Sequence, residues 1–144
     1  MRYLLASLLL LIGSNIFAAE KSTSVTMKPS SGIAGTVSFN IHPDQSVTVL
    51  IYESVSKISE TTLSIDSKAA AEMSELSELV LDEFISLKGY SQLPEYKQTS
   101  AIAITQDKVT KSISTRRYSE QLISLIKMIK GHLPERHQPQ LEKE

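Results

Sequence analysis

The sequence TVSFNIHPDQSVTVLIY, residues 36–52, predicts a β-hairpin. Its first part alternates apolar and polar residues, which is typical of a strand with one buried face, here formed by Val37, Phe39 and Ile41. Pro43 and Asp44 then predict a type I turn, because proline fixes φ at the second position of that turn. The β-branched run at residues 47–52 is the expected partner strand.

The segments on either side of this hairpin add strands and two helices. Residues 22–27 and 61–65 are candidates for short strands, and residues 101–105 and 109–115 predict a second hairpin that turns at residues 106–108. Two helices follow from apolar residues at steps of three and four, which are Met73, Leu76, Val80, Phe84 and Leu87, then Leu122, Leu125, Ile126, Ile129 and Leu133.

Polar residues mark the ends of both helices. Asp66 or Ser67 is the expected N-cap of the first helix, which should end at Lys88 and Gly89, and Ser119 is the expected N-cap of the second. The order is β-β-(β)-α-β-β-α. It predicts an α+β fold in which two helices pack on one face of an antiparallel sheet, around a core of Val37, Phe39, Leu76, Phe84, Ile102 and Leu125.

The 144 residues divide into three parts. Residues 1–19 carry a cation, an apolar run and two final alanines, which is the order of a secretory signal peptide, although an uncleaved anchor is the alternative. Residues 20–134 are the expected single domain, and residues 135–144 are an expected disordered tail. The predicted location is the periplasm or the medium, with no membrane anchor after cleavage.

Charge and composition exclude several kinds of protein. The net charge is −1, but residues 20–90 carry a net −5 and residues 91–144 a net +3. The basic half has no dense cationic cluster beyond Arg116 and Arg117, so nucleic acid is not an expected partner. The chain has no cysteine, which excludes disulfides, thiolate metal sites and a cysteine nucleophile.

The reactive side chains do not form a recognisable catalytic motif. His132 and His137 flank Pro134, which prevents the helical spacing that would bring both imidazoles onto one face. Acidic residues at positions 72, 75, 78 and 82 have the spacing of a solvated helix face. The sequence lacks a nucleophile elbow and a phosphate-binding loop. We therefore expect no enzyme, no metal site and no cofactor, but a protein that acts by surface recognition.

A five-residue segment adds a resemblance to a known family. The segment SGIAG, residues 31–35, resembles the Gly-Gly-Phe-Ala-Gly-like segment of the protealysin inhibitors, the emfourins. Leu79-Val80 with Phe84, and the apolar residues at 101–104 and 122–129, are similar to later parts of that family. The resemblance spans about residues 30–133. It implies a small inhibitor that fills the cleft of a thermolysin-like zinc metalloprotease.

The chain departs from that family in three respects. Ser31 replaces the first glycine, Ile33 replaces the phenylalanine, and a signal peptide is predicted. No inhibitory residue of the family is therefore carried over, and the candidate contacts come from the loops themselves. They are Ser31, Gly32, Ile33, Ala34, Gly35, His42 and Asp44, followed by residues 106–108.

Two alternatives remain open at this point. For the glycine segment, a bulge or tight turn that the fold requires is favoured over contact with a partner. The alternative function is a periplasmic accessory or structural protein that binds an envelope partner, and the oligomeric state is undetermined.

Overall fold

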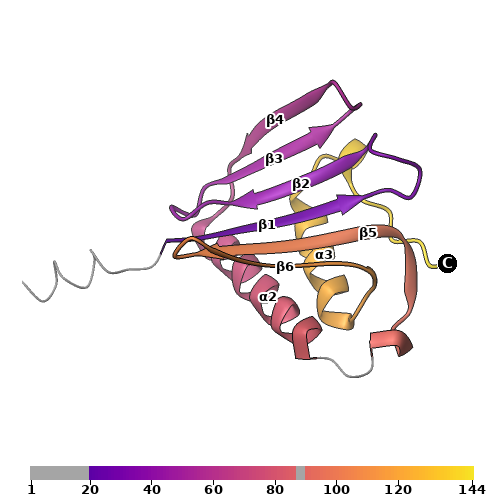
Figure 1. Ribbon diagram of the computed structural model, residues 1–144. Helices are drawn as coiled ribbons and strands as arrows, with labels where there is room; N and C mark the ends of the chain where they lie inside the picture. Colours follow the sequence, from indigo (N-terminus) through magenta and orange to yellow (C-terminus); the bar gives the residue numbers. More distant parts are fainter. Residues whose placement is uncertain (1–19, 87–89) are drawn as a thin grey trace, which may run out of the picture.

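The computed structural model of the protein describes residues 20–86 and 90–144 (Figure 1). The predicted signal peptide, and the predicted end of the first helix at residues 87–89, lie outside the described residues. The described chain forms a six-stranded sheet with two long helices. The α+β prediction is therefore confirmed.

All neighbouring strands of the sheet are antiparallel, and their order is β4-β3-β2-β1-β5-β6. The strands are β1 (Lys21–Lys28), β2 (Thr36–Ile41), β3 (Val47–Tyr52), β4 (Ile58–Leu63), β5 (Glu95–Gln106) and β6 (Val109–Arg117). The predicted hairpin of residues 36–52 is β2 with β3, in the register Thr36↔Tyr52 to Ile41↔Val47.

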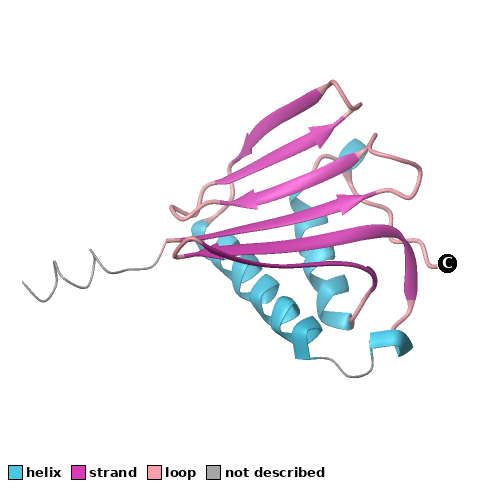
Figure 2. Ribbon diagram, viewed as in Figure 1, coloured by secondary structure: helices cyan, strands magenta, loops and turns pink. Residues whose placement is uncertain are grey.

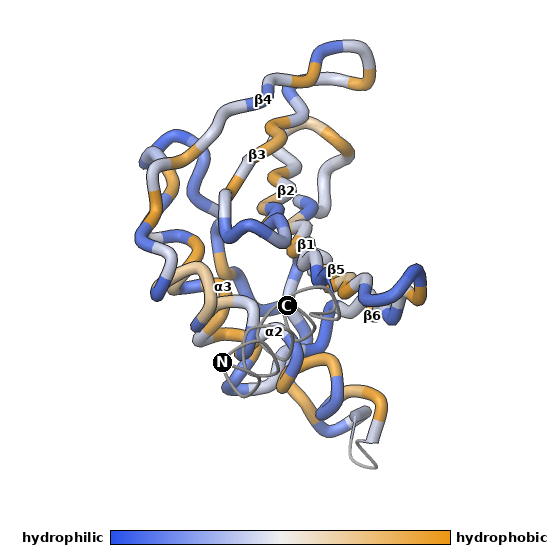
Figure 3. The backbone as a smooth tube through the Cα atoms, turned by 90° about the vertical axis from the view of Figure 1, so that its left-hand side faces the viewer, coloured by the Kyte–Doolittle hydropathy of each residue, from blue (hydrophilic) through white to orange (hydrophobic). Residues whose placement is uncertain are grey.

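Helices α2 (Ser67–Ser86) and α3 (Glu120–His132) pack on one face of the sheet (Figure 2). The view from the side shows the opposite face without a helix (Figure 3). Asp66 caps the N-terminus of α2, since its Oδ1 accepts a hydrogen bond from the Lys68 N–H at 3.3 Å. Ser119 caps α3 as predicted, because its Oγ accepts from the Leu122 N–H at 3.2 Å.

The core lies between the helices and the central strands. Phe39 is fully buried, between its register partners Val25 of β1 and Val49 of β3. The predicted stripe of α3 is buried in full, with Leu133 just beyond the helix.

The packing of α2 differs from the prediction. Leu76 and Phe84 are only partly buried, and the side that packs inward contains Ala70, Met73, Ser77, Val80 and Leu81. A serine can lie in this core because the Ser77 Oγ donates to the Met73 carbonyl at 2.7 Å. The predicted stripe followed the largest apolar side chains, whereas the helix also packs inward with small residues.

Strand boundaries also differ at two places. β5 begins at Glu95, six residues before the predicted start. Tyr96 in that added part stacks on Tyr118, with ring centroids 4.5 Å apart. β4 spans Ile58–Leu63 instead of residues 61–65, and it pairs with β3 over its full length.

The C-terminal segment differs most from its prediction, since it was expected to be disordered. Residues 135–144 instead contain a 3₁₀ turn, η2 (Glu135–His137), and then run beside the start of β5, where Lys143 bridges to Tyr96 (Figure 1). Leu141 packs against the core, and Glu142 and Glu144 form ion pairs with cations of the sheet. These contacts join residues far apart in the chain, so composition alone did not indicate them.

Candidate functional site

The sheet separates the predicted contact residues into two groups. The loop at residues 31–35 precedes Thr36, whereas His42 and Asp44 follow Ile41 at the other end of the same strand. Six residues of extended chain span roughly 20 Å. The seven predicted residues therefore do not converge on one site, and each end must be considered by itself.

The β1–β2 loop is held firmly and exposes an apolar side chain. The Gly35 N–H donates to the Tyr52 carbonyl at 2.8 Å, and the Thr36 N–H donates to the Ile33 carbonyl at 3.0 Å. Gly32 and Gly35 have φ values of 114° and 86°, in the region that favours glycine. The fold therefore requires glycine at both positions. Ile33, between them, has 36% of its surface exposed.

The β2–β3 turn uses its polar groups internally. The Gln45 N–H donates to the His42 carbonyl at 2.9 Å, as expected for the predicted type I turn. Asp44 accepts hydrogen bonds from the Ser46 hydroxyl and N–H at 2.6 and 2.9 Å, and these bonds lower the pKa of its carboxyl group. His42 Nε2 lies 2.8 Å from Thr48 Oγ1. Both predicted contact residues thus stabilise the hairpin.

The predicted turn at residues 106–108 lies at the same end of the sheet as this turn, because the hairpin of β5 and β6 closes there. Asp107 and Lys108 have φ values of 52° and 65°. Two such residues in succession match the tight turns that favour hairpins. This turn is therefore explained by the hairpin, like the turn after β2.

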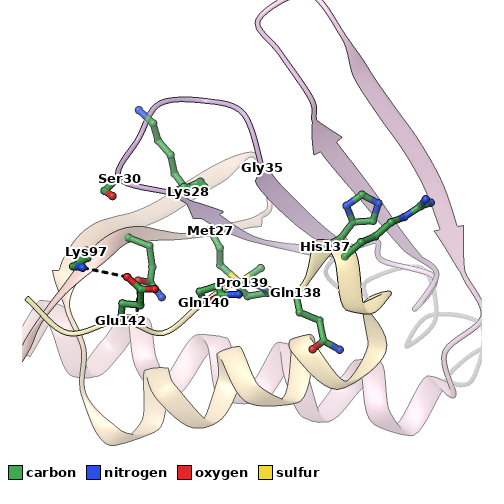
Figure 4. Close-up of a pocket in the computed structure, with 13 residues that line it drawn as sticks. Met27, Lys28, Ser30, Gly35, Lys97, His137, Gln138, Pro139, Gln140 and Glu142 are labelled. Carbon is green, nitrogen blue, oxygen red and sulfur yellow. Dashed lines mark hydrogen bonds and ion pairs between the residues drawn. The ribbon is translucent and has the colours of Figure 1, made fainter.

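A cavity of about 370 Å³ opens beside the β1–β2 loop (Figure 4). Its walls are the end of β1, part of the loop, β5 and the C-terminal segment. Its lining includes three cations and a histidine, which are Lys28, Lys97, Arg136 and His137. Glu142 is the acidic residue among the lining residues. An adjoining depression of about 300 Å³ shares Lys28 and Lys97 and adds Arg116. The surface is therefore basic.

Gln98 forms part of this cavity and is incompletely hydrogen-bonded. Gln98 is only 7% exposed. Its Oε1 accepts a hydrogen bond from the Glu142 N–H at 3.4 Å. Its Nε2 has no hydrogen-bond partner in the described part of the chain. A buried amide without a partner costs stability, and such groups are uncommon in folded proteins. Sequence reasoning missed this cavity because the C-terminal segment that closes it was expected to be disordered.

The helix-free face of the sheet carries many hydroxyl and amide groups. A shallow depression of about 400 Å³ on that face is lined mainly by small polar side chains, among them Ser22, Ser24, Asn40, Thr48 and Thr105. Glu60 and His42 lie at its border. Among these residues, Asn40 was predicted to face away from the core from the alternation of residues 36–41.

Glu78, one of the four acidic residues that the sequence placed on a solvated helix face, forms an ion pair with Lys21. Within residues 20–86 and 90–144, no three histidine, aspartate or glutamate side chains gather closely enough to hold a metal ion. None of the helices in that part of the chain is long and apolar enough to cross a membrane.

Comparison of the chain with family models and with curated proteins gave no match. The resemblance to the protealysin inhibitors therefore rests on the residues quoted for it.

Proposed function

We propose that the chain is an exported binding protein that inhibits a thermolysin-like metalloprotease through its β1–β2 loop. The main support is that this loop is anchored to the sheet while its side chain Ile33 is exposed. Two backbone hydrogen bonds fix the loop to the sheet, and Ile33 is presented between two glycines. The protein itself would not be an enzyme.

The anchored loop suits insertion into a cleft for two physical reasons. A loop that is already ordered loses less conformational entropy on binding than a mobile one. Glycines beside Ile33 let the walls of a cleft approach the backbone closely. The neighbouring β3–β4 loop lies at the same end of the sheet and adds Val55, which is 82% exposed. Both loops therefore present an exposed apolar side chain at the same end of the sheet.

Replacing Ile33 with aspartate tests the proposal. We expect the inhibition constant against a thermolysin-like protease from the same source to rise at least about 30-fold, since a central apolar contact contributes about 2 kcal/mol or more. The measurement is residual protease activity against the concentration of the purified chain. The matched control is Val109→Asp, because Val109 is 61% exposed at the opposite end of the sheet.

Two results would contradict the proposal. Equal inhibition by Ile33→Asp and the unchanged chain, with an intact fold by circular dichroism, would remove this loop from the interface. Absence of inhibition by the unchanged chain would remove the inhibitor function as a whole.

The second candidate function is an accessory protein that binds an envelope component. The hydroxyl-rich depression on the helix-free face favours it, since such a surface can form many hydrogen bonds with a polar partner. Co-sedimentation with purified cell envelopes distinguishes the two functions. An accessory protein would be retained by the envelopes and would leave the protease fully active.

A further inference from the structure

The last four residues of the chain occupy a gap in the sheet. β1 pairs with β5 only as far as Lys28↔Thr99, so residues 95–98 of β5 extend beyond the end of β1. The C-terminal segment takes the vacant place beside them. The Lys97 N–H donates to the Glu142 carbonyl at 2.8 Å, and the Glu144 N–H donates to the Glu95 carbonyl at 3.0 Å. We call this gap beside residues 95–98 the β5 slot.

Side chains add a simple pattern to these backbone bonds. Leu141 packs against the core at the entrance of the β5 slot. Glu142 pairs with Lys97 at 3.2 Å, and Glu144 pairs with Arg116. The slot thus accepts an extended segment in which an apolar residue is followed directly by a carboxylate, with a second carboxylate two positions after the first.

The tail fits the β5 slot imperfectly. The side chains in its ion pairs are 41–54% exposed, and exposed pairs contribute only about 0–1 kcal/mol each. The adjoining cavity stays open, and the Gln98 Nε2 lacks a partner within the described residues. Lys28 and Arg136 of the cavity form no ion pair in that part of the chain. A longer acidic segment could satisfy these groups.

We propose that the β5 slot is a binding site for an extended acidic segment of a partner protein, and that the C-terminal tail occupies it until the partner binds. The partner would add a strand beside β5, place its carboxylates on Lys97 and Arg116, and extend into the basic cavity. Main-chain bonds would provide affinity, and the cations would select an acidic sequence. This inference does not depend on protease inhibition.

The test frees the β5 slot in the full chain and then offers it a probe. The opened variant carries Leu141→Asp, Glu142→Gln and Glu144→Gln, which remove the apolar anchor and the charges of both acidic partners. The probe is a labelled peptide with the sequence QPQLEKE of residues 138–144. We expect saturable binding by fluorescence anisotropy to the opened variant, at least 10-fold weaker binding to the unchanged chain, and weaker binding at higher salt.

A matched pair of charge reversals locates the site. Lys97→Glu in the opened variant should weaken probe binding at least 10-fold. Lys111→Glu makes the same change in β6 opposite Ile104, far from the slot, and should leave binding unchanged. Hydrogen exchange of the Lys97 amide, measured in parallel, reports whether the tail has left the slot.

Each contrary outcome overturns the proposal. An opened variant whose Lys97 amide exchanges rapidly but binds no probe would show that the slot does not accept a segment in trans. A Lys97 amide that stays protected would show that the side chains do not hold the tail. A dimer of the unchanged chain in solution that exchanges tails would assign the slot to a second copy instead of a partner.

Discussion

Replacing Phe39 with alanine should lower the free energy of unfolding by about 3–5 kcal/mol. Phe39 is fully buried and lies opposite Val25 and Val49 in the two neighbouring strands, so its removal opens a cavity at the centre of the sheet. A domain of this size has a total stability of about 5–15 kcal/mol. The loss would therefore be a large share of the whole. Urea denaturation followed by circular dichroism measures it.

Phe84→Ala is the matched control, because it deletes the same atoms from a partly buried position. Phe84 lies on α2 and contacts Tyr90 edge to face, with ring centroids 5.6 Å apart. Its removal should cost clearly less than that of Phe39, since less surface loses its contacts and alanine favours the helix. Equal losses for the two variants would contradict the placement of the core.

The parts of the fold that were predictable depend on local patterns. The strict alternation of β2 and the turn at Pro43 predicted a hairpin, which the structure contains as β2 with β3. Ser119 and the stripe of α3 likewise combine a cap with a regular apolar period. In each case neighbouring residues carry the information, because capping and periodicity act over one or two turns of chain.

The unpredicted parts depend on contacts between distant segments. The start of β5 contains the polar residues Gln98, Thr99 and Ser100, so alternation of apolar residues does not reveal a strand there. The strand forms because Tyr96 stacks on Tyr118 and because the C-terminal segment pairs with it. The tail in turn pairs with Lys97 and Arg116, which come from two different strands. Neither segment could be placed before the other.

The candidate site shows the same division. The glycines at positions 32 and 35 correctly indicated a special backbone conformation, which their positive φ values explain. Proximity was not predictable from the same residues. Register places His42 and Asp44 at the far end of the sheet, and it brings residues 136–142 next to Lys28. Loop composition therefore suggested which residues are exposed, but strand order determined which of them share a surface.

Stability should fall in alkaline solution through one buried phenol. Burial raises the pKa of Tyr118 from about 10 to about 12, despite the hydrogen bond with Ser100 at 2.7 Å. A group whose pKa is raised by folding stabilises the fold fully below its unfolded pKa and loses that effect as pH rises through the folded value. The free energy of unfolding should therefore decrease by about 2 kcal/mol between pH 10 and pH 12.

Tyr118→Phe isolates this contribution. At neutral pH the variant should be less stable by about 1–3 kcal/mol, because buried Ser100 and the Gln98 carbonyl lose their hydrogen bonds to the phenol. Its stability should then change less between pH 10 and pH 12, so that the two curves converge. Parallel curves for Tyr118→Phe and the unchanged chain would contradict the burial of a neutral phenol.

Absorbance at 295 nm gives an independent check, since the chain contains neither tryptophan nor cysteine and the signal reports tyrosinate alone.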